Sequence, residues 1–219
     1  MRQTRRLGIG GCTALALTLF GAGVTSAAKV KPVKVTINQI TADGVGDAIG
    51  SITIKETKTG VDLAVDLSKL TPGEHGFHVH EHGMCDPADK EGKKTAGQSA
   101  GGHWDPAATK AHKGPGGGGH RGDLPKLVVP ESGKVKTKLS VEGLTLADLS
   151  GKALMIHLNG DNYSDTPKPL GGGGDRVACG VIPGGAPMPP AAMAPTTPAA
   201  AKPAPAEPMK APAAPAKTP

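Results

Sequence analysis

Aromatic residues are almost absent from this chain of 219 residues, which contains two Phe, one Tyr and one Trp. A buried core must therefore be built mainly from Val, Leu, Ile and Ala. A long amphipathic helical pattern is also absent, which argues against an all-helical fold. With so little aromatic surface to bury, any cross-link or bound metal would contribute an unusually large share of the stability.

Net charge is scarce once the two ends of the chain are set aside. The formal charge is +6, but Arg2, Arg5 and Arg6 supply three of these charges and residues 183–219 supply a net two. The middle of the chain is almost neutral. Neither nucleic-acid binding nor binding to an anionic membrane is therefore indicated.

The N-terminal segment has the composition of an export signal. Residues 1–28 combine three arginines, an apolar stretch at 7–24 and the small residues Thr25-Ser26-Ala27-Ala28. This pattern predicts a cleavable secretory signal, and we expect Cys12 to be removed with it. A twin-arginine signal at Arg5-Arg6 and a lipoprotein site at Cys12 are weaker alternatives. No stable membrane insertion is expected.

The C-terminal segment is of a different kind. Pro and Ala dominate residues 183–219, which predict a disordered, polyproline-like tail. A solvated linker is the simplest role for such a tail, and contact with the cell envelope is the alternative. Residues 29–182 remain as one domain of ordinary size.

Short runs of alternating apolar residues predict β-strands in this domain. The alternation occurs at Val33, Val35 and Ile37, at Ile52 and Ile54, and at Val61, Leu63, Val65 and Leu67. Glycine-rich turns separate the runs, as is typical of an antiparallel sandwich or barrel.

Histidine is the residue type that points to chemistry. His78 and His80 are two residues apart in a strand-like run, so their side chains share one face and can bind one ion. Imidazole ligands suit copper and zinc better than magnesium or calcium. Such a pair alone is more often an exposed or hydrogen-bonded polar pair without a metal. It therefore supports a metal site only together with the other histidines.

A glycine- and proline-rich loop at 100–125 supplies those histidines. It places His103, His112, His120 and Asp123 in one segment without helical or strand periodicity. Three nitrogens and one carboxylate oxygen form a closed tetrahedral zinc site. Zinc would then be mainly structural, because it supplies folding free energy to a loop without a core of its own.

Six motifs occur in a fixed order along the chain. They are G-F-H-V-H-E at 76–81, G-G-H-W-D-P at 101–106, G-H-R-G-D-L-P at 119–125, M-I-H at 155–157, D-N-Y-S-D at 161–165 and G-G-G-G-D-R-V-A-C-G-V-I at 171–182. Through them the chain resembles the bacterial, secreted type of copper,zinc superoxide dismutase, over about residues 34–182. The resemblance implies an all-β fold, an eight-stranded antiparallel Greek-key barrel with long metal-binding loops.

The resemblance also implies one copper and one zinc per subunit. The implied copper ligands are His78, His80, His103 and His157, and the implied zinc ligands are His103, His112, His120 and Asp123. His103 belongs to both sets, so its imidazolate would bridge the two metals. Asp161 is implied as the carboxylate that links a copper histidine to a zinc histidine, with Asp165 as a nearby alternative.

The implied reaction is dismutation of superoxide to dioxygen and hydrogen peroxide by redox cycling of copper. His103 would deliver a proton to the departing peroxide, and Arg176 would attract and dock the anionic substrate. Cys85 and Cys179 match the family's disulfide, which would stabilise the fold by about 4 to 5 kcal/mol. Such a bond needs an oxidising compartment, here most simply the bacterial periplasm, where the enzyme would protect the cell envelope.

Other readings remain open. A dismutase-like protein that stores or delivers metal would have lost ligands or the arginine, and none is lost here. A zinc-stabilised envelope module attached through its tail would leave copper incidental. Monomer and homodimer are both compatible with the sequence.

His75 and His82 match no ligand position, so we expect His75 to be structural and His82 to be exposed. Leu158-Asn159 stand where relatives more often have small residues, which would alter the rim of the copper site.

Overall fold

The computed structural model describes residues 30–184. The expected secretory signal lies outside the described residues, as does all but the first two residues of the expected tail. Within this range, no helix is both long enough and apolar enough to cross a membrane.

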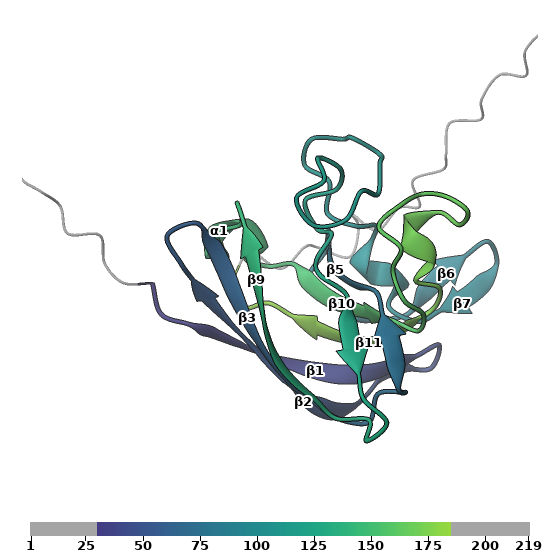
Figure 1. Cartoon of the computed structure of the whole chain (residues 1–219). Helices are drawn as coiled ribbons and strands as arrows, with labels where there is room; N and C mark the ends of the chain where they lie inside the picture. The colour runs from purple at the N-terminus through teal and green to yellow at the C-terminus, as the bar shows by residue number, and fades with distance from the viewer. Residues whose placement is uncertain (1–29, 185–219) are drawn as a thin grey trace, which may run out of the picture. The chain divides into compact units, whose positions relative to one another are not determined.

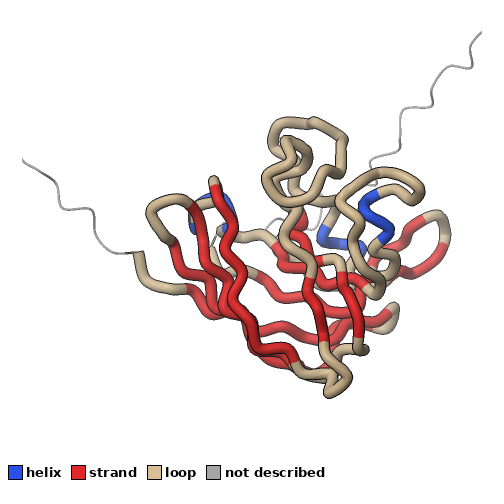
Figure 2. Tube along the Cα trace, in the orientation of Figure 1, coloured by secondary structure: helices blue, strands red, loops and turns tan. Residues whose placement is uncertain are grey.

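Strands dominate the described part of the chain (Figures 1 and 2). They are β1 (Val33–Thr41), β2 (Gly44–Glu56), β3 (Gly60–Leu67), β4 (Gly73–His75), β5 (Phe77–His80), β6 (Ala88–Lys90), β7 (Lys93–Thr95), β8 (Leu127–Val129), β9 (Val135–Glu142), β10 (Ala153–His157) and β11 (Arg176–Val181). Helical structure among these residues is limited to α1 (Leu146–Leu149) and the 3-10 turns η1 (Gln98–Ala100) and η2 (Leu170–Gly172). The predicted all-β class is confirmed.

Seven of the strands form one curled antiparallel sheet in the order β5-β10-β11-β1-β2-β3-β9. The pairs β1·β11 and β3·β9 join strands far apart in sequence, as Greek-key connections do. The pair β4·β8 and the hairpin β6·β7 stand apart from this sheet. The predicted count of eight strands is not confirmed, because Gly76 divides one run into β4 and β5 and the hairpin adds two short strands.

The core follows the alternation that is visible in the sequence. Val61, Leu63, Val65 and Leu67 of β3 are each at most 2% exposed, and their sequence neighbours Ala64 and Asp66 face outward. Aliphatic side chains fill most of the cluster, with Phe77 as its large buried aromatic residue. The aliphatic core predicted from the shortage of aromatics is therefore confirmed.

Strand β10 determines which residues meet at the functional end of the sheet. It pairs with β5 on one side, where Met155 faces His78, and with β11 on the other, where His157 faces Arg176. The disulfide expected between Cys85 and Cys179 is present and ties β11 to the segment that follows β5. Strand register thus brings together residues 78, 157 and 176, which are far apart in sequence.

Candidate metal centre

Three buried histidines converge from two neighbouring strands. His78 and His80 belong to β5, and His157 ends β10. The Nε2 atoms of His80 and His157 are 3.4 Å apart, and all three side chains are buried. Alternation within β5 puts residues 78 and 80 on one face, as their spacing predicts.

Main-chain carbonyl groups orient two of these rings. His80 Nδ1 lies 3.0 Å from the carbonyl oxygen of Gly101, and His157 Nδ1 lies 3.1 Å from that of Gly174. When each Nδ1 donates its proton to the carbonyl, the two Nε2 atoms face one another as lone pairs. Two lone pairs held 3.4 Å apart repel each other unless a cation lies between them, so the donor set fits a metal ion.

The loop residues form a second group around one carboxylate oxygen. Asp123 Oδ1 is 3.1 Å from His103 Nδ1, 3.0 Å from His112 Nδ1 and 3.4 Å from His120 Nδ1. A tetrahedral ion with bonds of about 2.0 Å separates its ligand atoms by about 3.3 Å. The Nδ1 atoms of His112 and His120 are buried and lack a well-aligned hydrogen bond within the described structure, as expected of atoms that bind an ion.

Ligand atoms cluster in two overlapping sets. Those of His78, His80, His103 and His157 lie within 4.8 Å of one another, and so do those of His78, His103, His112 and Asp123. His120 falls outside the second set, although its Nδ1 faces Asp123. All seven predicted ligands therefore lie in one cluster.

His103 occupies the middle of this cluster. Its ring centre is 5.1 Å from that of His80 and 5.3 Å from those of both His112 and His120. Because Nδ1 faces Asp123, the ring's other nitrogen, Nε2, is directed away from that carboxylate. One imidazole thus lies between the strand histidines and the loop ligands.

Main-chain pairing with β5 positions the loop. Val79 N–H donates to Gly122 O, and Trp104 N–H donates to Val79 O, each at 2.8 Å. These bonds form isolated bridges that set residue 123 opposite residue 78 and residue 103 opposite residue 80. A Cβ atom on Gly122 would lie 2.3 Å from Val79 O, so the close approach requires glycine.

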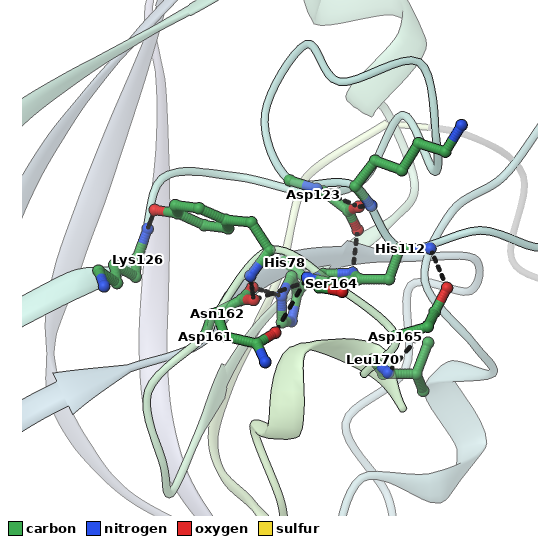
Figure 3. A network of polar contacts seen from close by, with 12 residues as sticks. His78, His112, Asp123, Lys126, Asp161, Asn162, Ser164, Asp165 and Leu170 are labelled. Carbon is green, nitrogen blue, oxygen red and sulfur yellow. Dashed lines mark hydrogen bonds and ion pairs between the residues drawn. The ribbon is translucent and has the colours of Figure 1, made fainter. Parts of the chain in front are cut away.

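Asp161 connects the two groups (Figure 3). Its Oδ2 is 2.8 Å from His78 Nε2, and its Oδ1 is 2.8 Å from His112 Nε2. Each ring is therefore held through Nε2, which leaves its Nδ1 free to bind an ion. Asp165, the alternative considered for this role, instead accepts from the main-chain N–H of His112.

The electrostatic environment differs between the two groups. Burial lowers the pKa of His80 and of His157 well below the usual value, and it lowers the pKa of His103 to about 4. Burial also opposes the charge on His112, but the Asp123 and Asp161 carboxylates outweigh it and raise the pKa of His112 to about 9. The strand histidines are thus neutral at pH 7 without metal, whereas His112 is protonated.

Arg176 lies beside the strand histidines. Its guanidinium donates to the carbonyl oxygen of Gly97 and, at 2.7 Å, to that of Gly101, the same carbonyl that His80 contacts. Burial lowers the pKa of Arg176 to about 10, so the side chain keeps its charge at pH 7. A fixed cation next to a histidine cluster suits the docking of a small anion.

The two histidines expected outside the metal site differ in outcome. His75 is buried, with Nδ1 2.7 Å from His157 O and Nε2 2.8 Å from Thr71 O, which confirms a structural role. The prediction that His82 is exposed is wrong. It is half-buried, because its ring packs against the main chain at Gly101.

Residues 158 and 159 were expected to affect the rim of the site. Leu158 is 43% exposed, and the main chain of Asn159 is hydrogen-bonded to Gly76 and Gly173.

The carbonyl groups of Gly101 and Gly174, which orient His80 and His157, were not predicted from the sequence. A main-chain acceptor has no signature of its own in the sequence.

The curled antiparallel sheet and the adjacent ligand sets define a histidine-rich dinuclear metalloprotein. A family model described as copper/zinc superoxide dismutase matches residues 48–182. Superoxide dismutase [Cu-Zn] of Escherichia coli strain K12 is 52% identical over 167 residues, which cover 76% of this chain and 96% of that protein. This chain belongs to the copper/zinc superoxide dismutase family.

Solved structures agree with that assignment. The Cu/Zn superoxide dismutase from Brucella abortus matches with a TM-score of 0.68 and 46% identity, over 69% of this chain and 99% of that one. The monomeric copper, zinc superoxide dismutase from Salmonella enterica matches with a TM-score of 0.63 and 52% identity, over the same shares of the two chains. Both relatives support the barrel fold and the family.

Proposed function

We infer that this chain is a superoxide dismutase that converts superoxide to dioxygen and hydrogen peroxide with bound copper and zinc. One observation carries the inference most directly. His103 lies between a group of strand histidines and a group of loop ligands, as a residue shared by two ions must. Membership of the family supplies the reaction.

Each metal has a distinct set of donor atoms in this proposal. Copper would be held by His78 Nδ1, His80 Nε2, His103 Nε2 and His157 Nε2. Zinc would be held by His103 Nδ1, His112 Nδ1, His120 Nδ1 and Asp123 Oδ1. The assignment is supported by the other ring nitrogens, because Asp161, Gly101 and Gly174 occupy those of His78, His112, His80 and His157. His78 is assigned to copper because it shares a strand face with His80.

Copper, when bound, supplies the one-electron redox chemistry of both half-reactions. Arg176 docks superoxide through its charged guanidinium, which two carbonyl groups hold in place. His103 Nε2, when it is not bound to copper, would carry the proton that the departing peroxide takes up, while Nδ1 would stay on the zinc side. Asp161 keeps the rings of His78 and His112 in fixed orientations during turnover.

An envelope location completes the proposal. The Cys85–Cys179 disulfide is favoured in an oxidising compartment, and residues 1–28 have the composition of a secretory signal. We propose that residues 29–182 are exported to the bacterial periplasm and protect the envelope from superoxide, with residues 183–219 as a linker. Deletion of 183–219 should leave dismutation intact; loss of activity would contradict the domain boundary, and loss of envelope retention would assign attachment to the tail.

The enzymatic proposal is tested by stopped-flow decay of superoxide with the full chain loaded with copper and zinc. We expect fast decay, and its loss in His80→Ala. The control is His82→Ala, which removes an imidazole two residues away and should retain most of the rate. Full metal occupancy without turnover in the parent would instead favour a protein that stores or delivers metal.

A further inference from the structure

Residues 161–165, the D-N-Y-S-D motif, contact the zinc-side loop at more points than the family assignment of Asp161 requires. Asp161 holds the ring of His112, as described above. Asp165 holds the main chain of the same residue, since its Oδ2 accepts from His112 N–H at 2.8 Å (Figure 3). The other oxygen of Asp165 accepts from Leu170 N–H at 3.1 Å. One short segment therefore fixes His112 at both its ring and its backbone.

Tyr163 makes the third set of contacts. Its main-chain N–H donates to Asp161 Oδ1 at 2.7 Å, and its hydroxyl accepts from the main-chain N–H of Lys126 at 3.0 Å. Its side chain lies against Gly114, where an added Cβ would be 2.7 Å from Tyr163 Cβ and Cγ. Tyr163 therefore joins Asp161 to both ends of the stretch that contains His120 and Asp123.

The backbone of Tyr163 indicates that these contacts act together. Its φ is +59°, in the left-handed region that residues with a Cβ adopt rarely and at an energetic cost. Such a conformation persists when surrounding interactions hold it. For Tyr163 these are the hydrogen bond of its main-chain N–H to Asp161, that of its hydroxyl with Lys126 N–H, and the packing at Gly114. Gly114 has a φ of +70°, so substitution there meets both strain and a clash.

We propose that Tyr163 and Asp165 are positioning residues that hold the zinc-side loop in its binding geometry, in addition to Asp161. The proposal rests on the assignment of zinc to the loop ligands made above. His112 lies outside any strand, and its main-chain N–H donates to the Asp165 carboxylate rather than to a strand partner. Asp165 fixes the position of its backbone, Asp161 fixes the rotation of its ring, and Tyr163 keeps the carboxylate of Asp161 in place.

Zinc binding should therefore be weaker in variants that leave every ligand intact. Removing an outer partner of a metal ligand typically lowers metal affinity by about 10- to 100-fold. We expect Asp165→Asn to lower zinc affinity about tenfold or more, because an amide cannot accept from both His112 N–H and Leu170 N–H. Tyr163→Phe removes only the acceptor for Lys126 N–H and should lower affinity by about threefold.

The test uses the full, copper-free chain with its disulfide intact, and measures zinc affinity by competition with a chromophoric chelator. The matched control is Asp175→Asn, which makes the same charge change in the same connecting loop at an exposed side chain without a hydrogen bond in the described region. Its zinc affinity should stay within about twofold of the parent. The cobalt-loaded forms provide a second readout, because the visible spectrum of cobalt reports ligand geometry.

The outcomes separate this proposal from the one on which it rests. Weaker zinc binding and an altered cobalt spectrum in Asp165→Asn and Tyr163→Phe, but not in Asp175→Asn, support positioning. Unchanged affinity and spectrum in both variants, or equal losses in the control, overturn it. Lower melting temperatures of the metal-free variants with an unchanged cobalt spectrum would assign the two residues a role in folding alone. A parent chain that binds neither zinc nor cobalt would contradict the proposed function instead.

Discussion

The two ligand groups are built in different ways. His78, His80 and His157 lie on paired strands, so the register of β5 and β10 determines their positions. His112, His120 and Asp123 belong to a loop, whose shape depends on bridges to β5 and on carboxylates from another loop. The strand group is positioned by the sheet, whereas the loop group is positioned by bridges and side-chain contacts, to which a bound metal would add.

The protonation of the two groups differs in the same sense. Burial among neutral rings lowers the pKa of His80 and His157, while the Asp123 and Asp161 carboxylates raise the pKa of His112 against the effect of burial. Metal can bind the strand group without displacing a proton from it. In the proposed assignment, zinc would have to displace the proton of His112, which would make metal binding by the loop group the more pH-dependent of the two near pH 7.

The largest expected effect comes from removing the residue that both groups share. His103→Ala should lower the dismutation rate by at least about a hundredfold, because it removes both the shared ligand and the proton donor. It should also make the visible spectrum of bound copper independent of zinc. Stopped-flow kinetics and absorbance spectra of the loaded variant provide the measurements; a rate within a few-fold of the parent would refute the role of His103.

The next largest effect should fall on the strand group alone. Arg176→Ala removes the cation next to His80, so turnover should fall about tenfold and its dependence on ionic strength should weaken. Zinc affinity should not change, because Arg176 contacts none of the loop ligands. Lys69→Ala removes an equal charge from an exposed side chain and serves as the control. An unaltered salt profile in Arg176→Ala would count against substrate docking.

The disulfide should affect stability more than chemistry. Cys85 and Cys179 close a loop with a sequence separation of 94 residues, for which chain entropy predicts about 4 to 5 kcal/mol. Reduction should lower the melting temperature of the metal-loaded protein by about 10 °C or more, as scanning calorimetry would detect. A melting temperature unchanged by reduction would show that the sheet and the metals suffice.

The smallest effect concerns protons in the metal-free chain. His103, with a pKa of about 4, stays neutral where unfolded histidine takes up protons, so stability should fall as the pH drops from about 6.5 towards 4. His112, with a pKa raised to about 9, adds stability that is complete below about pH 6.5 and is lost as the pH rises through 9. NMR titration of the histidine rings measures the pKa values of His103 and His112. A common midpoint near 6.5 for the two rings would contradict the difference in pKa between the two groups.

Sequence patterns predicted those parts of the molecule that depend on local periodicity or on side-chain identity. The alternation of Val61, Leu63 and Val65 predicts a strand with one buried face, and β3 has this form. The motifs identified every proposed ligand, and the structure brings these residues together in one cluster. The resemblance also supplied the pairing of Cys85 with Cys179, which spacing alone does not give.

Features that depend on tertiary structure were beyond reach of the sequence. The carbonyl groups of Gly101 and Gly174 orient two histidines, but any residue has a carbonyl group. The half-buried state of His82 results from packing against a distant turn, and local pattern does not report it. The left-handed backbone of Tyr163 could not be predicted from the sequence, because contacts with Asp161 and Lys126 accompany it in the folded structure.

The shared position of His103 between the two ligand groups is the centre of this account. The most direct test records the copper spectrum of the fully loaded parent chain before and after selective removal of zinc. The account predicts a clear change, because loss of zinc alters the charge on the imidazole that both metals share. An identical copper spectrum with and without zinc would show that His103 does not bridge them.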